Sequence, residues 1–368
     1  MAVGFPTKAN WAAGDVLTAS AMDDLAGTVN LLNPSGNFAA GKNKIINGDF
    51  YVNQRGFTST TSSLTYTFDR WQTVTSGGTA TYSAQTFTPG TAPVAGYEGK
   101  NFTRIVTTGQ SGSTNFTGFQ QKIEDVRTLA GQTATISFWA KAASGTPKIS
   151  IVTEQSFGTG GSPSSVVTTL VGEVTLSTSW VRFSVTGTVP SISGKTIGSA
   201  GDSALLIELY VSVGTGLTAY GDQGLQSNTF DIWGVQVEAG SVVTAFQTAT
   251  GTIQGELAAC QRYYFRNTPG AGNSALGNGA ATATTNAKIQ IKLPVTMRVT
   301  PTSLDYVAMY LSDGVSAITG ITSYTLGTCN KDVANVAFGV SGGTLAQFRY
   351  YDLETLNSTD YIGFSAEL

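Results

Sequence analysis

The sequence contains no histidine. Without an imidazole, the Ser-His-Asp and Cys-His arrangements of hydrolases and histidine-ligated metal sites are excluded. There are two cysteines, Cys260 and Cys329. A disulfide between them is an open alternative, and two free, buried thiols are the interpretation that we favour. We therefore expect no metal, no cofactor and no catalytic residue, so that the protein is not an enzyme.

Charge is also scarce in this chain. Charged residues make up 12 % of it, against a usual share of about 25 %, and the formal net charge is −3. No basic patch is visible, which argues against a nucleic-acid partner or an anionic membrane surface. We find no signal peptide and no long apolar run, so we expect no membrane insertion. A role outside a cell would then follow lysis, as part of a particle.

The composition that remains is typical of an all-β protein. Glycine is abundant, with 44 residues, and threonine and serine fill the polar positions that charged residues occupy elsewhere. β-Branched residues between glycine turns favour strands. A length of 368 residues suggests two or three domains. We expect two β-sandwich, jelly-roll-like domains joined by a short helix, after a short N-terminal helical attachment segment.

The stretch from Thr229 to Arg266 organises the chain. Phe230 to Glu238 has the pattern of a strand, with Trp233, Val235 and Val237 on one face under the period-2 rule. Ile253 to Phe265 has apolar residues at helical spacing. The expected domains are therefore a sandwich over 46–250, a connecting helix within 251–267, and a receptor-facing sandwich over 268–368.

Residues 1–45 are expected to form the attachment segment, with a short helix over 21–32. Its apolar residues follow the 3, 4, 3 spacing of a coiled-coil seam, and they are Met22, Leu25, Val29 and Leu32. One interpretation is a small amphipathic helix packed on its own domain. The other is a self-association seam in a homotrimer, which would need further contacts because fewer than two heptads cannot hold chains together.

Several segments alternate as strands of a sandwich do. In 205–213 the residues Leu205, Ile207, Leu209, Val211 and Val213 share one face, and Glu208 and Tyr210 lie on the other. Residues 135–139 and 181–185 alternate in the same way. In the C-terminal part, Ile289, Ile291 and Leu293 alternate with Lys288, Gln290 and Lys292.

Five blocks in a fixed order carry a family resemblance. They are KNKIINGDFYVNQRG, FDRW, GFQQKIEDVRTLAGQTATISFWAKA, FDIWGVQVEAG and ELAACQRYYFR, within residues 41–266. Together they resemble the jelly-roll domain of bacteriophage tail-fibre and tail-spike proteins, which is similar to carbohydrate-binding modules. The resemblance implies a structural virion protein made in the host cytoplasm, a trimeric fibre or adhesin. Its N-terminus would bind other tail or neck proteins, and its β-domains would recognise a host surface glycan.

Sugar binding requires aromatic planes beside hydrogen-bonding groups. Trp139, Arg182, Glu208 and Tyr210 fit this description if their strands adjoin, and we take them as the candidate carbohydrate-binding residues. The competing interpretation is a packing surface against a neighbouring subunit or domain. Two alternative functions stay open. One is a tail spike that cleaves polysaccharide, with Glu154 and Glu208 as a carboxylate pair, and the other is a free carbohydrate-binding module.

Overall fold

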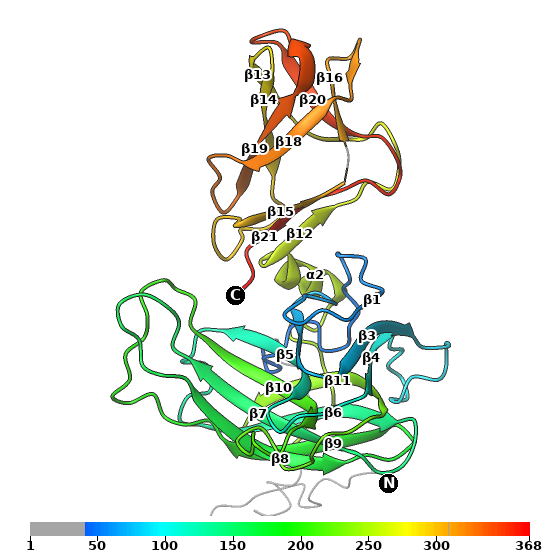
Figure 1. Cartoon of the computed structure of the whole chain (residues 1–368), viewed down its shortest axis with the longest axis vertical. Helices are drawn as coiled ribbons and strands as arrows, with labels where there is room; N and C mark the ends of the chain where they lie inside the picture. The colour runs from blue at the N-terminus through cyan, green and yellow to red at the C-terminus, as the bar shows by residue number, and fades with distance from the viewer. Residues whose placement is uncertain (1–40, 308) are drawn as a thin grey trace, which may run out of the picture.

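The computed structural model describes residues 41–307 and 309–368. Strands dominate this part of the chain, which has a single α-helix, α2 (Ile253–Gln261), and one short 3-10 turn, Ser341–Gly343 (Figure 1). The all-β prediction is therefore confirmed. The expected helix over 21–32 and its seam, Met22, Leu25, Val29 and Leu32, lie outside the described residues. Within those residues, no helix has the length and apolarity needed to cross a bilayer.

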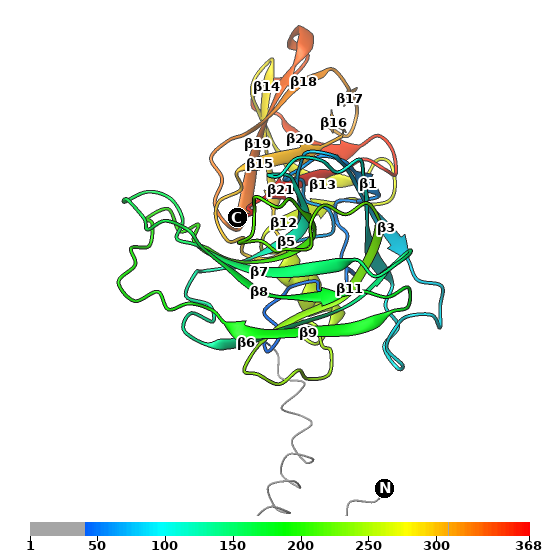
Figure 2. The ribbon, with the colours of Figure 1, turned by 60° about the horizontal axis from the view of Figure 1, so that its bottom comes forward.

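Residues 46–250 form two antiparallel sheets that face each other as two layers (Figures 1 and 2). One sheet has six strands in the order β1-β3-β4-β11-β6-β9, and the other has five in the order β2-β5-β10-β7-β8. The strands are β1 Ser59–Thr60, β2 Trp71–Ser76, β3 Thr79–Thr86, β4 Asn101–Thr108, β5 Phe116–Glu124, β6 Thr133–Ala142, β7 Lys148–Ser156, β8 Val167–Thr175, β9 Val181–Thr188, β10 Ala204–Val213 and β11 Thr229–Ala239.

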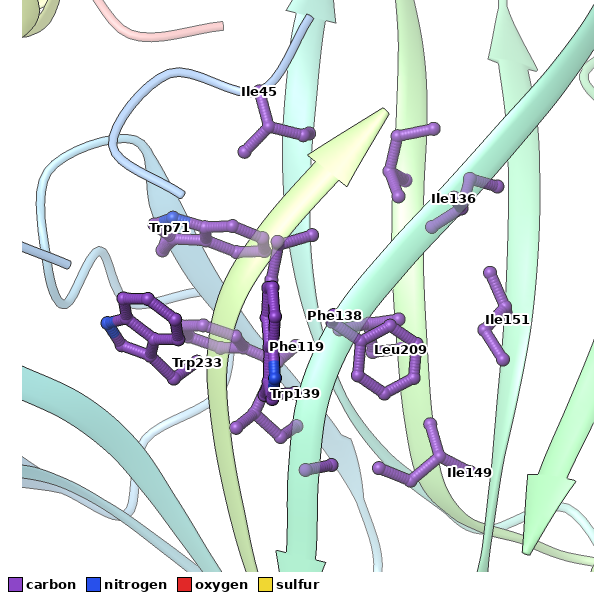
Figure 3. Packing of buried hydrophobic residues seen from close by; sticks show 14 of the residues in the cluster. Ile45, Trp71, Phe119, Ile136, Phe138, Trp139, Ile149, Ile151, Leu209 and Trp233 are labelled. Atoms are coloured by element: carbon purple, nitrogen blue, oxygen red, sulfur yellow. The ribbon is translucent and has the colours of Figure 1, made fainter. Parts of the chain in front are cut away.

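The core between the two sheets is built by the expected alternation. On β10, Leu205, Ile207, Leu209 and Val211 are all buried in one apolar cluster, which also contains Phe138 of β6 (Figure 3). Burying such side chains contributes about 1.5–3 kcal/mol each, which makes this cluster the main stabilising element of the sandwich.

Two bulges change which face a strand presents. On β10 the register shifts between Tyr210 and Ser212, so that Val213 joins Tyr210 in a small cluster on the outer face, contrary to our prediction that it shares the inner face. On β11 the register shifts between Trp233 and Gln236, around Gly234 with φ +66°. An extra residue at a bulge reverses the sides of all residues beyond it.

Because of the bulge at Gly234, the predicted common face of Trp233 and Val237 is wrong. Trp233 pairs with Trp139, whereas Val237 pairs with Ile136. Because Trp139 and Ile136 point to opposite faces of β6, Trp233 lies on the outer face and Val237 on the inner one. Trp233 does not share a face with Val237, as we expected, but it is fully buried because loops cover that outer face.

The connecting helix is shorter than expected. Thr252 caps α2 by accepting a hydrogen bond from the Gly255 backbone N–H at 3.1 Å, and the helix ends at Gln261. The helix was expected to reach Phe265, but Tyr264–Asn267 forms β12. This segment pairs with β21, Ile362–Ser365. A backbone ladder with a distant strand therefore overrides the local helical spacing.

Residues 264–368 form a three-stranded sheet (β12-β21-β15) and a seven-stranded sheet (β17-β16-β20-β13-β14-β19-β18) over one shared apolar core. The strands not yet bounded are β13 Ala275–Ala283, β14 Asn286–Lys292, β15 Ser303–Tyr306, β16 Met309–Ser312, β17 Ala317–Ile318, β18 Ile321–Leu326, β19 Val333–Val340 and β20 Tyr350–Thr355. On β14, the predicted alternation is confirmed, because Ile289 and Ile291 are buried and Lys288, Gln290 and Lys292 are exposed.

Residues Ala366–Leu368, here called the C-terminal tail, lie against the first sandwich. Arg70 is fully buried there and forms an ion pair with Glu367. Its guanidinium also stacks on the Tyr263 ring at 3.5 Å. Arg298 donates to the carbonyl oxygens of Ala366, Glu367 and Gly201 at 3.0–3.1 Å. The tail thus joins the two groups of sheets through buried polar contacts.

The remaining junction contacts involve the connecting helix. Arg262 follows α2 and donates to both carboxylate oxygens of Glu124, at 2.9 and 3.0 Å. Tyr263 donates to the same carboxylate at 2.8 Å. Both cysteines are free, Cys260 buried and Cys329 half-buried, so the predicted free thiols are confirmed and the predicted burial holds only for Cys260.

Candidate functional site

The four residues predicted to form one carbohydrate site separate into two pairs. Trp139 on β6 and Arg182 on β9 are register partners in the six-stranded sheet, and the guanidinium lies 4.5 Å from the centre of the Trp139 ring. Glu208 and Tyr210 lie on β10 in the five-stranded sheet, and the tyrosine hydroxyl donates to the carboxylate at 3.1 Å. The strands do not adjoin, so the predicted four-residue site does not form.

The residues of both pairs are also largely covered. Trp139 packs against Trp233 and Phe246, with ring centres 5.3 and 5.8 Å apart. Glu208 and Tyr210 are only 3 % and 4 % exposed. Three of the four side chains therefore pack within the first sandwich itself, and not as a surface that is open to a ligand.

An open cavity lies directly beside the aromatic layer that contains Trp139. Tyr97 contacts Trp233 and Phe246 at ring-centre distances of 5.6 and 5.3 Å. Tyr97 and Phe246 line a cavity of about 460 Å³, which we call the Tyr97 pocket. Its other lining residues are Asp49, Tyr51, Gly96, Glu98, Gln247, Thr248, Gly251, Thr252, Ile253 and Glu256.

Four short segments bring these side chains together. Asp49 and Tyr51 follow the turn at Asn47, Tyr97 lies in the connection between β3 and β4, and Phe246 lies after β11. Glu256 is in the first turn of α2. Hydrogen bonds link three of these segments, from the Tyr97 hydroxyl to Asp49 and from the Asn47 backbone N–H to Glu256.

Hydrogen bonds hold two carboxylates that line the pocket, those of Asp49 and Glu256. Asp49 accepts from the Tyr97 hydroxyl at 2.7 Å and from the Tyr51 backbone N–H at 3.3 Å. Glu256 accepts from the backbone N–H groups of Asn47 and Thr250, each at 2.7 Å. Each carboxylate keeps further lone pairs with which it can accept hydrogen bonds from a ligand.

Burial has the largest effect on the pKa values of these two carboxyl groups. It raises the pKa of the Asp49 carboxyl above its ordinary value, against the lowering effect of its hydrogen bonds. Burial also raises the pKa of Glu256, and the charge of Asp49 acts in the same direction. The two acids are therefore close enough to influence each other, and they share a poorly hydrated site in which hydrogen bonds are strengthened.

Aromatic surface completes the pocket. Tyr51 is 36 % exposed, so part of its ring is open to solvent, and Lys100 lies 5.4 Å from the centre of the ring. Open aromatic rings beside hydrogen-bonding carboxylates can hold a molecule that has both apolar faces and hydroxyl groups. Sequence analysis missed these residues because their segments are far apart. The only available signal was Asn47-Gly48-Asp49-Phe50-Tyr51 within the first family block.

Comparisons with known proteins find similarity to solved structures alone, several of which are carbohydrate-binding modules. No family model matches the sequence, and no curated protein matches it. Solved structures are similar to parts of the chain, among them the CBM22-2 xylan-binding domain from Paenibacillus barcinonensis Xyn10C, with 18 % identity, a TM-score of 0.30, and coverage of 46 % of this chain and 92 % of that one.

Two further structures are similar at the same level. A putative sugar binding protein from Bacteroides thetaiotaomicron has 15 % identity, a TM-score of 0.34, and coverage of 54 % of this chain and 100 % of that one. The family 11 carbohydrate-binding module from Clostridium thermocellum, in complex with a mixed-linked tetrasaccharide, has 14 % identity, a TM-score of 0.29, and coverage of 51 % and 99 %. At these scores the function must be inferred from the residues of this chain.

Proposed function

We propose that this protein binds a glycan in the Tyr97 pocket and does not cleave it. The observation that carries the proposal is the combination of open aromatic surface at Tyr51 with two buried, hydrogen-bonded carboxylates, Asp49 and Glu256, in one cavity of about 460 Å³. Apolar faces of sugar rings stack on aromatic rings, and carboxylates accept hydrogen bonds from sugar hydroxyls.

Each side chain that lines the pocket would make a different contact with the sugar. Tyr51 offers an exposed ring on which a pyranose can stack, and Phe246 provides an apolar wall. Asp49 and Glu256 accept hydroxyl protons, and Tyr97 fixes the orientation of Asp49 through its hydrogen bond. Because the carboxylates are already held by backbone N–H groups, little ordering is needed when the ligand binds.

A binding titration tests this proposal. Calorimetry or ligand-observed magnetic resonance with xylan-, glucan- and galactan-derived oligosaccharides should detect binding to the full chain. We expect Tyr51→Ala and Asp49→Asn each to weaken binding about tenfold, since each removes one contact of roughly 1.4 kcal/mol. Tyr306→Ala is the matched control, because Tyr306 is also part-exposed, at 42 %, but lies on β15. Equal affinity of Tyr51→Ala and the unmodified protein would refute the proposal.

The absence of cleavage is part of the same proposal and needs its own assay. Asp49 and Glu256 are two acids with raised pKa in one pocket, an arrangement that glycoside hydrolases also use. In this protein both acids are held by hydrogen bonds within the chain. Incubation with the bound polysaccharide should release no new reducing ends, and release that Glu256→Gln abolishes would show that the protein is a hydrolase.

We further propose that the chain is a trimeric tail fibre or adhesin of a bacteriophage virion, attached through residues 1–45 to other tail or neck proteins. The ordered family blocks within 41–266 support this role. Ile253 and Leu257, one turn apart on α2, are 56 % and 37 % exposed, which suits a contact between copies at the connecting helix. The sandwich over 46–250 and the receptor-facing region 268–368 would then act as successive domains of the fibre.

Mass measurement in solution tests the assembly. Light scattering at micromolar concentration should give three times the mass of the chain, which is 38.2 kDa. Ile253→Lys together with Leu257→Lys should shift the protein toward monomer without lowering its content of β-structure, since both side chains are exposed. A stable monomer for the unmodified protein would contradict the trimeric fibre and leave the glycan proposal intact.

A further inference from the structure

The outer face of the seven-stranded sheet carries a row of polar side chains in register. Asp352 on β20 pairs with Asn278 on β13, Asn278 pairs with Gln290 on β14, and Gln290 pairs with Asn335 on β19. Register partners lie on the same side of a sheet, so these four side chains form one line across four neighbouring strands. Their opposite neighbours, such as Ile289 of β14, are buried in the core. We call this line the amide row.

A second line of residues runs beside the amide row. Tyr350 on β20 pairs with Ala280 on β13, and Ala280 pairs with Lys288 on β14. Tyr350 is 71 % exposed, and Lys288 is exposed as well. Since adjacent strands are about 4.8 Å apart, the tyrosine and the lysine rise roughly 10 Å from each other with only the methyl group of Ala280 between them.

This arrangement leaves a hollow in the face. A depression of about 400 Å³ is lined by Asn278, Gly279, Ala280, Lys288, Gln290, Thr328, Asn335 and Tyr350. Gly279 pairs with Ile289, and a Cβ at Gly279 would stand 1.9 Å from the Lys288 carbonyl oxygen, so the two strands approach each other closely under the hollow. A second depression of about 510 Å³ also includes Asn278 and Gln290 and extends along β14 to Lys292. The two hollows therefore adjoin at the amide row.

Most polar side chains in the hollow make no hydrogen bond or ion pair within the described part of the chain. Among the described residues, the side chains of Asn278, Gln290 and Lys288 have no polar partner. Asn335 is different, because its Nδ2 donates to the Thr328 carbonyl and its position is thereby fixed. Each free amide offers two donors and an acceptor, so Asn278 and Gln290 can both donate to and accept from a ligand.

From this geometry we propose that the outer face of the seven-stranded sheet is a second saccharide-binding surface, separate from the Tyr97 pocket. A sugar ring lies over Ala280, stacked on the side of Tyr350, and its hydroxyls exchange hydrogen bonds with Asn278 and Gln290. Lys288 donates to a ring oxygen, a hydroxyl or a carboxylate of the same saccharide. The second hollow receives the next unit of the saccharide along β14.

The chemistry favours a saccharide over other ligands. A purely apolar ligand would leave the amides of Asn278 and Gln290 without partners, which costs about 1–3 kcal/mol for each buried group. A nucleic acid would require a cluster of basic residues, and Lys288 and Lys292 are the only ones on β14. Hydroxyl-rich rings satisfy neighbouring amides and use an exposed tyrosine at the same time.

Magnetic resonance offers a direct test on the full chain, because side-chain amides of asparagine and glutamine give their own signals. The probes are soluble tetrasaccharides of glucose, galactose, xylose and galacturonic acid. We expect at least one of them to shift the side-chain amide signals of Asn278 and Gln290 in a saturable manner. Tyr350→Ala should weaken that binding about tenfold, and Asn278→Ala and Gln290→Ala about three- to tenfold each.

Two controls separate this surface from its alternatives. Phe348→Ala removes an aromatic ring that is 79 % exposed and does not line the hollow, so it should leave the affinity unchanged. Tyr51→Ala should weaken binding in the Tyr97 pocket about tenfold and leave the shifts of the amide row intact, so failure of one site is distinguishable from failure of the other.

Three outcomes would overturn the proposal. No probe shifts the two amide signals, or the shifts persist unchanged in Tyr350→Ala, or the same signals move with protein concentration in the absence of sugar. The last result would show that the face is a contact between copies of the chain.

Discussion

The Glu208 carboxyl provides a test of how burial controls stability. It lies on the outer face of β10, 3 % exposed, and its Oε2 is buried without a hydrogen-bond partner among the described residues. The groups that face it are Tyr210 on its own strand and Glu154 on β7. Burial, helped by the charge of Glu154, raises the pKa of Glu208 from 4.5 to about 8.

The sign and size of the effect follow from this pKa. The folded chain binds the Glu208 proton more tightly than the unfolded chain does. The contribution of Glu208 to the free energy of unfolding is therefore fully present below pH 4.5 and is lost as the pH rises toward about 8. At about 1.4 kcal/mol per pKa unit, the loss approaches roughly 5 kcal/mol as an upper limit. For a protein of this size that corresponds to a fall in Tm on the order of 10 °C.

Substitution by glutamine isolates this contribution. Glu208→Gln has the shape of the protonated acid and can still accept from Tyr210, but it carries no proton that can be lost. We expect the Tm of the variant to fall much less between pH 5 and pH 8 than the Tm of the unmodified protein. Thermal unfolding followed by circular dichroism at half-unit pH steps measures this. Glu98→Gln is the control, since Glu98 is exposed. Parallel pH profiles for Glu208→Gln and the unmodified protein would refute the reasoning.

Three further predictions concern the junction and the bulge. Glu367→Ala leaves Arg70 buried without its carboxylate, and the free energy of unfolding from urea titration should fall by about 3–5 kcal/mol. Arg262→Ala breaks a pair whose side chains are 42 % and 37 % exposed, so the same titration should show a loss below about 1 kcal/mol. Gly234→Ala places a Cβ 2.7 Å from the Trp139 ring at φ +66°, and should lower the Tm more than the control Gly240→Ala, which meets nothing within 4 Å.

The sequence predicted many of the strands but not all of them, since Tyr264–Asn267 was expected to be helical, and it did not predict the face of every residue. Alternation along 205–211 predicted which residues face the core, and alternation along 288–293 predicted which residues are buried, because burial on one face of a sheet imposes a period of two. The bulges at Gly234 and after Tyr210 interrupt that period. A bulge depends on pairing with a neighbouring strand, so a single strand's pattern does not reveal it.

The candidate site was harder to predict than the fold. Trp139 and Glu208 have the residue types of a sugar site, yet they are covered by other parts of the chain. Whether an outward-facing side chain is exposed to solvent depends on the loops that cross the sheet. The loop that carries Phe246, for example, covers Trp139. The Tyr97 pocket is formed by residues as distant as Asp49 and Glu256, which only the folded chain brings together.

The C-terminal tail has a consequence for the order in which this protein can be completed during translation. Most of the first sandwich is available to fold once residue 239 has left the ribosome, since β11 is its last strand. Arg70 must then wait for Glu367, synthesised almost three hundred residues later, before its charge is neutralised. Domains fold as units from the N-terminus during synthesis. Until Glu367 docks, a ribosome-bound or truncated chain would therefore hold a folded sandwich with an unpaired arginine at its junction, where chaperones or neighbouring nascent chains can reach it.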